Sequence, residues 1–255
     1  MELKNKVAII TGGARGIGAS VARLFAREGA NVVIGDVLTE EANQVVEDIK
    51  AIGRDALAIK TDVRIEDEVN NLIKVTYEKY RRVDILVNNA GILRIGSIEE
   101  ICVKDWDDMF ATNLRSAFLA SKAVMPIMKK QKSGNIVSLS SCAAKIGGVR
   151  SAASYSCAKA GISCLTLCLA RELASYNVRV NAVAPGAVNT KMIFPEDKPK
   201  GHNPEDLKQC IESIPLGLGE PEDIAEGILF LVSKRSRWIT GEILDINGGY
   251  LMDVI

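Results

Sequence analysis

The chain has 255 residues, and its 32 Lys plus Arg balance 32 Asp plus Glu, so the formal net charge is zero. This balance excludes the large basic surface of most nucleic-acid-binding proteins, and a hydrophobic content of 47% excludes an intrinsically disordered chain. Because no apolar run approaches the roughly 20 residues that span a bilayer and no signal peptide follows Met1, we expect a cytoplasmic protein without a membrane partner. The six cysteines and single histidine lack zinc-ligand spacing, so we expect no metal.

Short β-branched segments alternate with helical patterns along the whole chain. Strands are predicted at 7–11, 31–35, 56–60, 84–88, 135–140, 178–184 and 242–246. Helices are predicted at 19–28, 40–52, 66–80, about 105–130, 153–175 and 222–233. This alternation is typical of βαβ units, which form a parallel sheet with helices on both faces. We therefore expect an α/β fold with a doubly wound parallel sheet of the Rossmann type, in a single domain spanning 1–255.

One segment interrupts the alternation. It contains four prolines and a glycine, namely Pro195, Pro199, Gly201, Pro204 and Pro215. We expect an inserted loop at about 191–214, with a short helix near 205–212, which covers the substrate site as a lid. His202 lies in this loop, where we expect either a solvated side chain or a substrate contact.

A glycine-rich turn follows the first predicted strand, with the sequence TGGARGIG at 11–18. Glycines allow the backbone to approach a pyrophosphate, and the helix that starts there offers free N–H groups and the positive end of its dipole. Asp36 ends the second strand, where a carboxylate binds the adenosine ribose hydroxyls of NAD and repels the 2′-phosphate of NADP. Arg15 is a cation that could instead accept that phosphate, but we give Asp36 more weight and expect NAD.

Tyr155 and Lys159 are four residues apart in a predicted helix, so their side chains share a face. A free tyrosine has a pKa of about 10, and a neighbouring ammonium favours its phenolate. We expect Lys159 to lower the pKa of Tyr155 toward neutrality, so that the phenol acts as general acid or base between a hydroxyl and a carbonyl. Ser140 and Ser141 end a strand at the ligand edge of the sheet, and either could donate a hydrogen bond to the reacting oxygen.

Together these motifs resemble the short-chain dehydrogenase/reductase family, and the resemblance covers essentially the whole chain. The landmarks follow the family order: TGGARGIG at 11–18, Asp36, Asp62-Val63, NNAG at 88–91, Asn113, Ser141, Tyr155 with Lys159, PGAVNT at 185–190 and ITGEILDINGG at 239–249. Each motif is weak by itself, but the ordered set is specific.

The resemblance implies a role for each of these residues. The implied cofactor contacts are Gly12, Arg15 and Ile17 along the pyrophosphate and adenosine, Asp36 at the ribose, Asp62 and Val63 at the adenine, Asn89 along the cofactor chain, Val188 and Thr190 at the nicotinamide carboxamide, and Tyr155 and Lys159 at the nicotinamide ribose. The implied catalytic set is Asn113, which supports a proton-relay water, Ser141, which positions the substrate oxygen, and the Tyr155–Lys159 pair.

Two positions depart from the family pattern. The gap from Ser141 to Tyr155 is one residue longer than usual, and we place the extra residue in 145–151, beside the substrate. We choose Ser141 over Ser140 because the Ser-Cys-Ala-Ala that begins at Ser141 resembles the family's serine segment. Asn247 stands where an aspartate is commoner, which concerns subunit packing more than chemistry.

The expected activity is therefore hydride transfer between NAD and a secondary alcohol or ketone, in a homotetramer. Sugars or polyols, 3-oxoacyl thioesters and hydroxysteroids remain alternative substrates. Lysines at 129, 130 and 132 could dock an acidic acyl carrier protein, but they also complement a helix C-terminus, and Ser175-Tyr176-Asn177 lacks the further basic residue of carrier-protein reductases. A dinucleotide-binding protein without turnover is a second class of function. An extended epimerase is disfavoured by the length of the chain.

Overall fold

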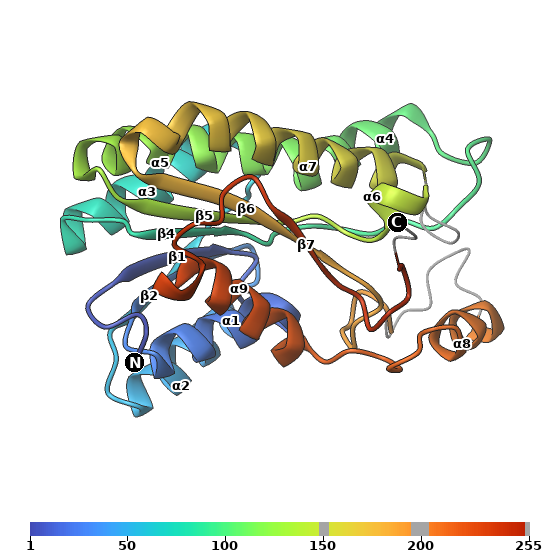
Figure 1. The fold of residues 1–255 in the computed structure, drawn as a ribbon, viewed down its shortest axis with the longest axis horizontal. Coiled ribbons are helices and arrows are strands. Elements are labelled where there is room, and N and C mark those ends of the chain that lie inside the picture. Colours follow the sequence, from blue (N-terminus) through green and yellow to red (C-terminus); the bar gives the residue numbers. More distant parts are fainter. Residues whose placement is uncertain (148–152, 195–203, 253–255) are drawn as a thin grey trace.

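The computed structural model describes residues 1–147, 153–194 and 204–252. These residues form a parallel sheet with the order β3-β2-β1-β4-β5-β6-β7 (Figure 1). The strands are β1 (Val7–Thr11), β2 (Asn31–Asp36), β3 (Ala56–Lys60), β4 (Ile85–Asn88), β5 (Gly134–Leu139), β6 (Val178–Pro185) and β7 (Ile243–Ile246). The α-helices are α1 (Gly16–Arg27), α2 (Thr39–Ala51), α3 (Glu66–Tyr80), α4 (Val103–Phe110), α5 (Ser116–Gln131), α6 (Ala143–Ile146), α7 (Ala153–Leu173), α8 (Pro204–Glu212) and α9 (Pro221–Val232).

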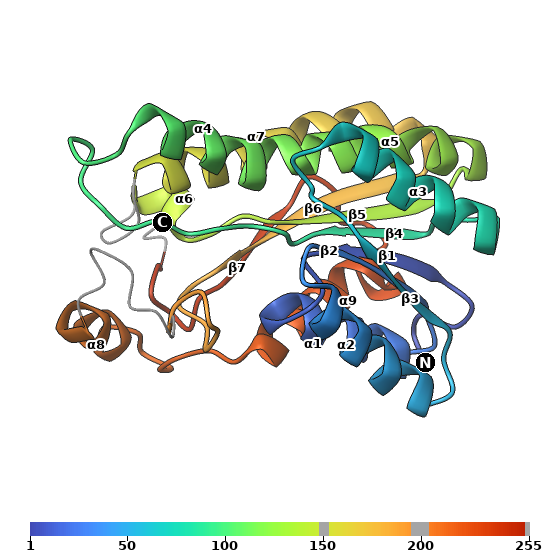
Figure 2. The same ribbon diagram turned by 180° about the vertical axis from the view of Figure 1, so that it is seen from behind.

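Helices cover both faces of the sheet, which confirms the predicted doubly wound α/β fold. Figures 1 and 2 show α1, α2 and α9 on one face and α3, α5 and α7 on the other. The chain starts at β1 in the middle, builds outward to β3, and then returns to the other side of β1 with β4. In open parallel sheets, ligands bind at the carboxyl ends of the strands where the order reverses. The fold therefore places the candidate site beyond the ends of β1 and β4.

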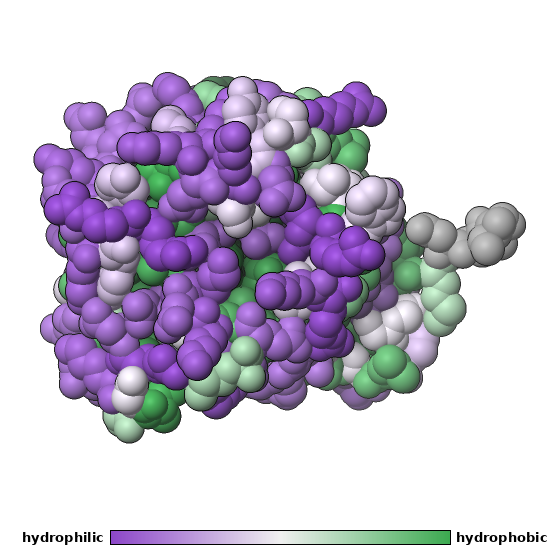
Figure 3. Space-filling view, turned by 60° about the vertical axis from the view of Figure 1, so that its left-hand side comes forward, coloured by the Kyte–Doolittle hydropathy of each residue, from purple (hydrophilic) through white to green (hydrophobic). Residues whose placement is uncertain are grey.

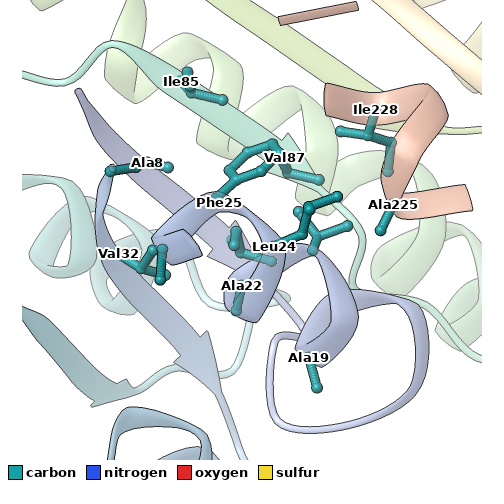
Figure 4. Close-up of a cluster of buried hydrophobic side chains, with 14 of the residues drawn as sticks. Ala8, Ala19, Ala22, Leu24, Phe25, Val32, Ile85, Val87, Ala225 and Ile228 are labelled. Carbon is teal, nitrogen blue, oxygen red and sulfur yellow. The ribbon is translucent and has the colours of Figure 1, made fainter. Parts of the chain in front are cut away.

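Each face of the sheet packs against its helices through its own apolar cluster. On the face of α1 and α9, the fully buried ring of Phe25 lies among side chains from three strands, and Figure 4 shows it with Ala8, Val32, Ile85 and Val87. Burying a phenylalanine side chain contributes about 1.5–3 kcal/mol. The opposite cluster includes Ile9, Leu72, Leu86, Val124 and Leu173. Because alternate residues of the central strands enter the two clusters, the sequences of these strands are apolar at consecutive positions.

By length and composition alone, α7 with the turn that follows it to Tyr176 could cross a membrane. In the structure this helix packs against β5 and β6 and carries the buried Lys159, as expected of a core helix in a globular protein. On the face of the molecule in Figure 3, hydrophilic side chains predominate and apolar surface occurs in interrupted areas.

Most predicted elements match the observed ones within two residues, with three informative differences. α1 begins at Gly16, three residues before the predicted start, because the glycines themselves form its first turn. The predicted helix at 105–130 is α4 and α5 joined by a π turn at Ala111–Arg115. The one-turn α6 was not predicted.

The predicted helix near 205–212 is confirmed as α8. Residues 195–203 of the predicted loop, including His202, lie outside the described residues, and so do 148–152 of the segment before Tyr155.

Candidate active site

Several of the predicted motifs begin or end at the carboxyl ends of the strands, whereas Asn113, Tyr155 and Lys159 lie in helical segments. Thr11 ends β1, Asp36 ends β2 and Asn88 ends β4, while Ser140 and Ser141 directly follow β5. Since all the strands are parallel, these ends meet at one edge of the sheet. Residues that are far apart in sequence thus come together there.

The glycine-rich turn after β1 is held by Asn89. The Asn89 Nδ2 donates hydrogen bonds to the carbonyl oxygens of Thr11 and Gly12, at 3.0 and 2.7 Å. In return, the Thr11 Oγ1 accepts from the backbone N of Asn89 and of Ala90, both at 3.2 Å. The Asn89 amide, for which the resemblance implies a cofactor contact, therefore also fixes the shape of the turn. Thr11 is a residue that the sequence analysis did not single out.

Two glycines of the turn are required by contacts within the protein. Gly12 has a φ of +66°, and a Cβ there would lie 2.7 Å from the Cα of Ala90. A Cβ on Gly18 would lie 2.2 Å from the carbonyl oxygen of Gly12 and 2.5 Å from the Asn89 Nδ2. The helix that follows has Arg15 at its N-cap without a side-chain capping bond, so its first N–H groups are oriented as in anion-binding helix termini. The turn thus fits a pyrophosphate.

Asp36 is buried with both carboxylate oxygens in use. Its Oδ2 accepts a hydrogen bond from the Ala14 backbone N at 2.9 Å, and its Oδ1 accepts one from the Leu38 N at 3.0 Å. The first bond links the end of β2 to the glycine-rich turn. The carboxylate is therefore held rigidly beside the turn, which fits the ribose-binding role that the sequence predicts.

Asp62 has a partner that the sequence analysis missed. The Arg64 guanidinium binds its carboxylate through Nε, at 2.9 and 3.1 Å, and through Nη2, at 2.6 Å. This hydrogen bonding, which is stronger than the opposing effect of burial, lowers the pKa of Asp62. An adenine bound at Asp62 and the buried Val63 would therefore share the carboxylate with Arg64. The position of Arg64, two residues after Asp62, was the feature of the sequence that could have indicated this pairing.

The structure distinguishes the two serines after β5. The Ser140 Oγ is 3.0 Å from the carbonyl oxygen of Lys159 and 2.9 Å from the Ser163 Oγ, so it joins β5 to α7. The Ser141 hydroxyl, by contrast, acts on the phenol of Tyr155 and lowers its pKa. Ser141 and Tyr155 therefore converge on one point, as a shared contact to a substrate oxygen requires.

The pKa values of Tyr155 and Lys159 differ from the expectation. Burial raises the pKa of Tyr155 to about 12, although the hydroxyl of Ser141 opposes this rise. Burial also lowers the pKa of Lys159 to about 8. The Lys159 Nζ lies 5.7 Å from the centroid of the Tyr155 ring and donates to the carbonyl oxygen of Leu139 at 2.7 Å. The predicted lowering by Lys159 is therefore not met, because the buried site disfavours both charged forms.

Asn113 lies in the π turn between α4 and α5 and is buried. Its amide is paired with the backbone of Ile92, just beyond the NNAG segment. A Cβ added to Gly91 would lie 2.6 Å from the Asn113 Oδ1 and 3.6 Å from the Lys159 Nζ. Asn113 and Lys159 thus both approach Gly91, and the Asn113 oxygen leaves room only for a glycine there.

The segment that follows β6, at 186–190, packs against the glycine-rich turn. Val188 is buried in the apolar cluster of α1 and α9, and the Thr190 Oγ1 donates to the carbonyl oxygen of Val188 at 3.3 Å. The Thr190 side chain also packs on Gly16, where an added Cβ would lie 3.3 Å from its Cγ2. A residue implied for the nicotinamide end of a dinucleotide thus packs against the glycine-rich turn. Ile17 packs from α1 against the same cluster.

Within the described ranges, no group of three or more His, Cys, Asp and Glu side chains could hold a metal ion. The residues at this edge do fit a dinucleotide, because a glycine-rich helix start and a buried, oriented carboxylate lie beside each other.

Comparison with known proteins agrees with this geometry. Residues 12–251 match the family model described as enoyl-(acyl carrier protein) reductase. The chain is 38% identical over 253 residues to the 3-oxoacyl-[acyl-carrier-protein] reductase FabG of Thermotoga maritima, covering 99% of this chain and 100% of that protein. It is 42% identical over 256 residues to the 2,5-dichloro-2,5-cyclohexadiene-1,4-diol dehydrogenase LinX of Sphingobium indicum, covering 99% of each.

A solved structure shares the fold over nearly the whole chain. The crystal structure of a short-chain type dehydrogenase/reductase from Mycobacterium marinum superposes with a TM-score of 0.91 at 30% identity, covering 98% of this chain and 96% of that one. With the ordered motifs and the fold, these matches show that the chain belongs to the short-chain dehydrogenase/reductase family of oxidoreductases, which bind nicotinamide dinucleotides.

Proposed function

We propose that the protein is an NAD-dependent oxidoreductase that transfers hydride between the nicotinamide and a secondary alcohol or its ketone. The observation that carries this proposal is the meeting of three groups: the hydroxyl of Ser141 acts on the phenol of Tyr155, and the buried Lys159 Nζ lies 5.7 Å from the centroid of the Tyr155 ring. A substrate oxygen can receive a hydrogen bond from the serine while it exchanges its proton with the tyrosine. When bound, the nicotinamide supplies the acceptor or donor of the hydride.

In the direction of alcohol oxidation, Tyr155 takes the hydroxyl proton while the hydride leaves the same carbon. The phenol must first lose its own proton, and its pKa of about 12 opposes this. The positive charge of an oxidised nicotinamide and the ammonium of Lys159 both favour the phenolate. In the direction of ketone reduction, Tyr155 donates its proton to the developing alkoxide. We assign Asn113, next to Lys159 at Gly91, to the path that returns protons to solvent.

The preference for NAD is supported by Asp36. Its charge lies at the end of β2 and is fixed by two backbone hydrogen bonds, so it cannot turn away from a 2′-phosphate. The exposed residue that follows, Val37, offers no positive charge to such a phosphate. Arg15 is exposed on the turn and is the cation there that could attract NADP.

A 3-oxoacyl-carrier-protein reductase is the second candidate, because relatives with that name are 38–41% identical over nearly the whole chain. The lysine cluster at the end of α5 gives it limited support, since Lys129 already pairs with Glu172 at 2.9 Å and lies over the ring of Tyr176. The relative named as a cyclohexadiene-diol dehydrogenase instead favours a cyclic secondary alcohol. No contact in the described residues favours a hydroxysteroid.

We further propose a cytoplasmic homotetramer in which the described residues at 191–194 border the substrate. Exposed apolar side chains on helices of the same face, Phe118 on α5 and Leu167 on α7, support self-association. Exposed Met192 and Phe194 at the start of the loop support a contact with an apolar part of the substrate.

The test is the absorbance of reduced nicotinamide while the pure protein is given cyclic diols, sugars and polyols, hydroxysteroids and 3-hydroxyacyl thioesters, with NAD and separately with NADP. Turnover of one class with NAD supports the proposal and names the substrate. The reverse panel, ketones and 3-oxoacyl thioesters with NADH or NADPH, tests the second candidate. If the protein binds NADH and turns over no compound in either direction, it is a binding protein and the proposal fails.

A further inference from the structure

The first turn of α9 contacts both sides of the proposed cofactor site. The Asn189 Nδ2 donates to both carboxylate oxygens of Glu220, each at 3.2 Å. Two residues further on, the Glu222 Oε1 accepts from the Ser20 Oγ of α1 at 3.1 Å. Asn189 lies between Val188 and Thr190, and Ser20 lies in the first turns of the helix that follows the glycine-rich turn. One helix terminus thus connects the segment implied for the nicotinamide with the segment implied for the pyrophosphate.

The backbone around Asn189 is also fixed to the approach to α9. Val188 and Gly219 form a parallel β-bridge, in which the Asn189 N donates to the carbonyl oxygen of Gly219 at 2.8 Å and the Gly219 N donates to that of Ala187 at 3.1 Å. These bonds bring together the two ends of the chain segment that contains α8. The bond from Asn189 to Glu220 adds a side-chain link next to this bridge.

Glu220 is itself held in place. It is the N-cap of α9 in a reciprocal capping box, in which its carboxylate accepts from the backbone N of Asp223 and its own N donates to the Asp223 Oδ2 at 2.8 Å. Pro221 at the first helical position restricts the backbone further. The carboxylate that receives Asn189 therefore has a defined position, although Asn189 and Glu220 are both exposed.

We propose that Asn189 and Glu220 are positioning residues for the nicotinamide end of the cofactor. The proposal rests on the proposed function, because Val188 and Thr190 are implied as the carboxamide contacts. Asn189 lies between them, so its bond to Glu220 holds Thr190 against Gly16 and keeps both contacts oriented. Neither side chain needs to touch the cofactor. The effect of losing the bond should then appear at the nicotinamide and not at the adenosine.

The experiment compares two ligands by calorimetry. NADH carries the nicotinamide, and ADP-ribose has the same adenosine, pyrophosphate and ribose without it. For Asn189→Ala we expect the Kd of NADH to rise about five- to tenfold, as for loss of one charge-assisted hydrogen bond, while the Kd of ADP-ribose and the melting temperature stay unchanged. Glu220→Ala should have the same effect on NADH. Glu220→Gln keeps an acceptor oxygen and should restore most of the affinity.

A matched control is available on α2, where the Gln44 Nε2 donates to the Asp48 Oδ1 at 3.2 Å in an equally exposed amide–carboxylate bond. Gln44→Ala should change neither Kd. The double variant with Asn189→Ala and Glu220→Ala should bind NADH no more weakly than the worse single variant, because both remove the same bond.

Two results would overturn the inference: unchanged NADH binding by Asn189→Ala, or an equal loss for NADH and ADP-ribose, which would indicate general damage to the fold. A wild-type protein that binds neither NADH nor NADPH would instead refute the proposed function, and the inference with it.

Discussion

Asn113 and Ile92 exchange two hydrogen bonds: the Ile92 N donates to the Asn113 Oδ1 at 2.9 Å, and the Asn113 Nδ2 donates to the Ile92 O at 3.0 Å. Asn113 lies in the π turn, where the helical hydrogen-bond pattern is locally widened. The exchange attaches the helices α4 and α5 to the segment after β4, beside Gly91. One side chain therefore sets where these helices lie relative to Lys159.

Asn113→Leu tests this attachment. Leucine has a similar size but leaves the N and O of Ile92 without their partner, so we expect the free energy of unfolding to fall by about 1–3 kcal/mol. We also expect turnover to fall. Ser116→Ala is the control, since it removes one bond of the same turn, from the Ser116 Oγ to the carbonyl oxygen of Thr112. Denaturant unfolding and turnover measure both variants, and unchanged values for Asn113→Leu would contradict the prediction.

Tyr155→Phe removes the phenolic oxygen that is proposed to exchange the substrate proton. Turnover should fall by about 10²–10⁴, the range for loss of a general acid or base. The Kd of NAD should change less than about twofold, since the ring remains. Tyr80→Phe is the control, because it removes a phenol from α3, away from the site. Ordinary activity in Tyr155→Phe would show that the assigned proton transfer is wrong.

The stability of the protein should depend on pH through Lys159. Its pKa of about 8 in the folded protein is below the unfolded value of about 10.4, so between these values the unfolded chain binds more protons. The cost of burying the charge is present below pH 8 and disappears as the pH rises toward 10. The free energy of unfolding of wild type, relative to Lys159→Met, should therefore rise over this interval by on the order of 2–3 kcal/mol. A flat difference would contradict the lowered pKa.

Asp36→Asn and Asp36→Ala test cofactor choice. Each removes the charge that opposes a 2′-phosphate, so the ratio of kcat/KM with NAD to that with NADP should fall by about tenfold, the equivalent of ~1.4 kcal/mol. Only the alanine variant removes every acceptor for the Ala14 and Leu38 N–H groups, so its melting temperature should fall further. If the ratio stays the same in both variants, Asp36 does not select the cofactor.

Gly18→Ala should destabilise the protein even without cofactor. The new Cβ would lie 2.2 Å from the carbonyl oxygen of Gly12, so the turn must shift, at a cost of about 1–3 kcal/mol for overpacking. Gly53→Ala is the comparison, because its φ of +78° is strained but nothing lies within 4 Å of the added Cβ. It should cost about 1 kcal/mol. Thermal unfolding without added cofactor measures both variants. An equal loss of stability in Gly18→Ala and Gly53→Ala would show that the turn can adapt to the added Cβ.

Much of the fold could be predicted because strands and helices carry different apolar periodicities. β3 (Ala56–Lys60) and α3 (Glu66–Tyr80) have the predicted bounds. Each keeps a single apolar pattern along its length and is bounded by polar residues. The π turn could not be predicted, because the apolar pattern continues through it and the contact that accompanies it, that of Asn113 with Ile92, is tertiary. α6 is a single turn, too short for a periodic signal.

The site could be predicted as a set of residues but not as a set of contacts. Ser140 and Ser141 are adjacent at the end of a strand, and only their partners in α7 separate them. The direction of the pKa shift of Tyr155 could not be predicted either. The spacing places Lys159 nearby but does not show how far the phenol is buried away from water. The bond between Asn189 and Glu220 joins residues 31 positions apart, and no local pattern indicates it.

The contacts of Gly12 and Gly18 show that a glycine-rich motif can be required for folding as well as for binding a dinucleotide. Both glycines are required by Ala90, Asn89 and the turn's own backbone, whether or not a dinucleotide is present. A descendant of this protein that stopped binding nucleotides would still need both of them in order to fold. In such a descendant we therefore expect substitutions first at Asp36, Tyr155 and Lys159, while both glycines are retained.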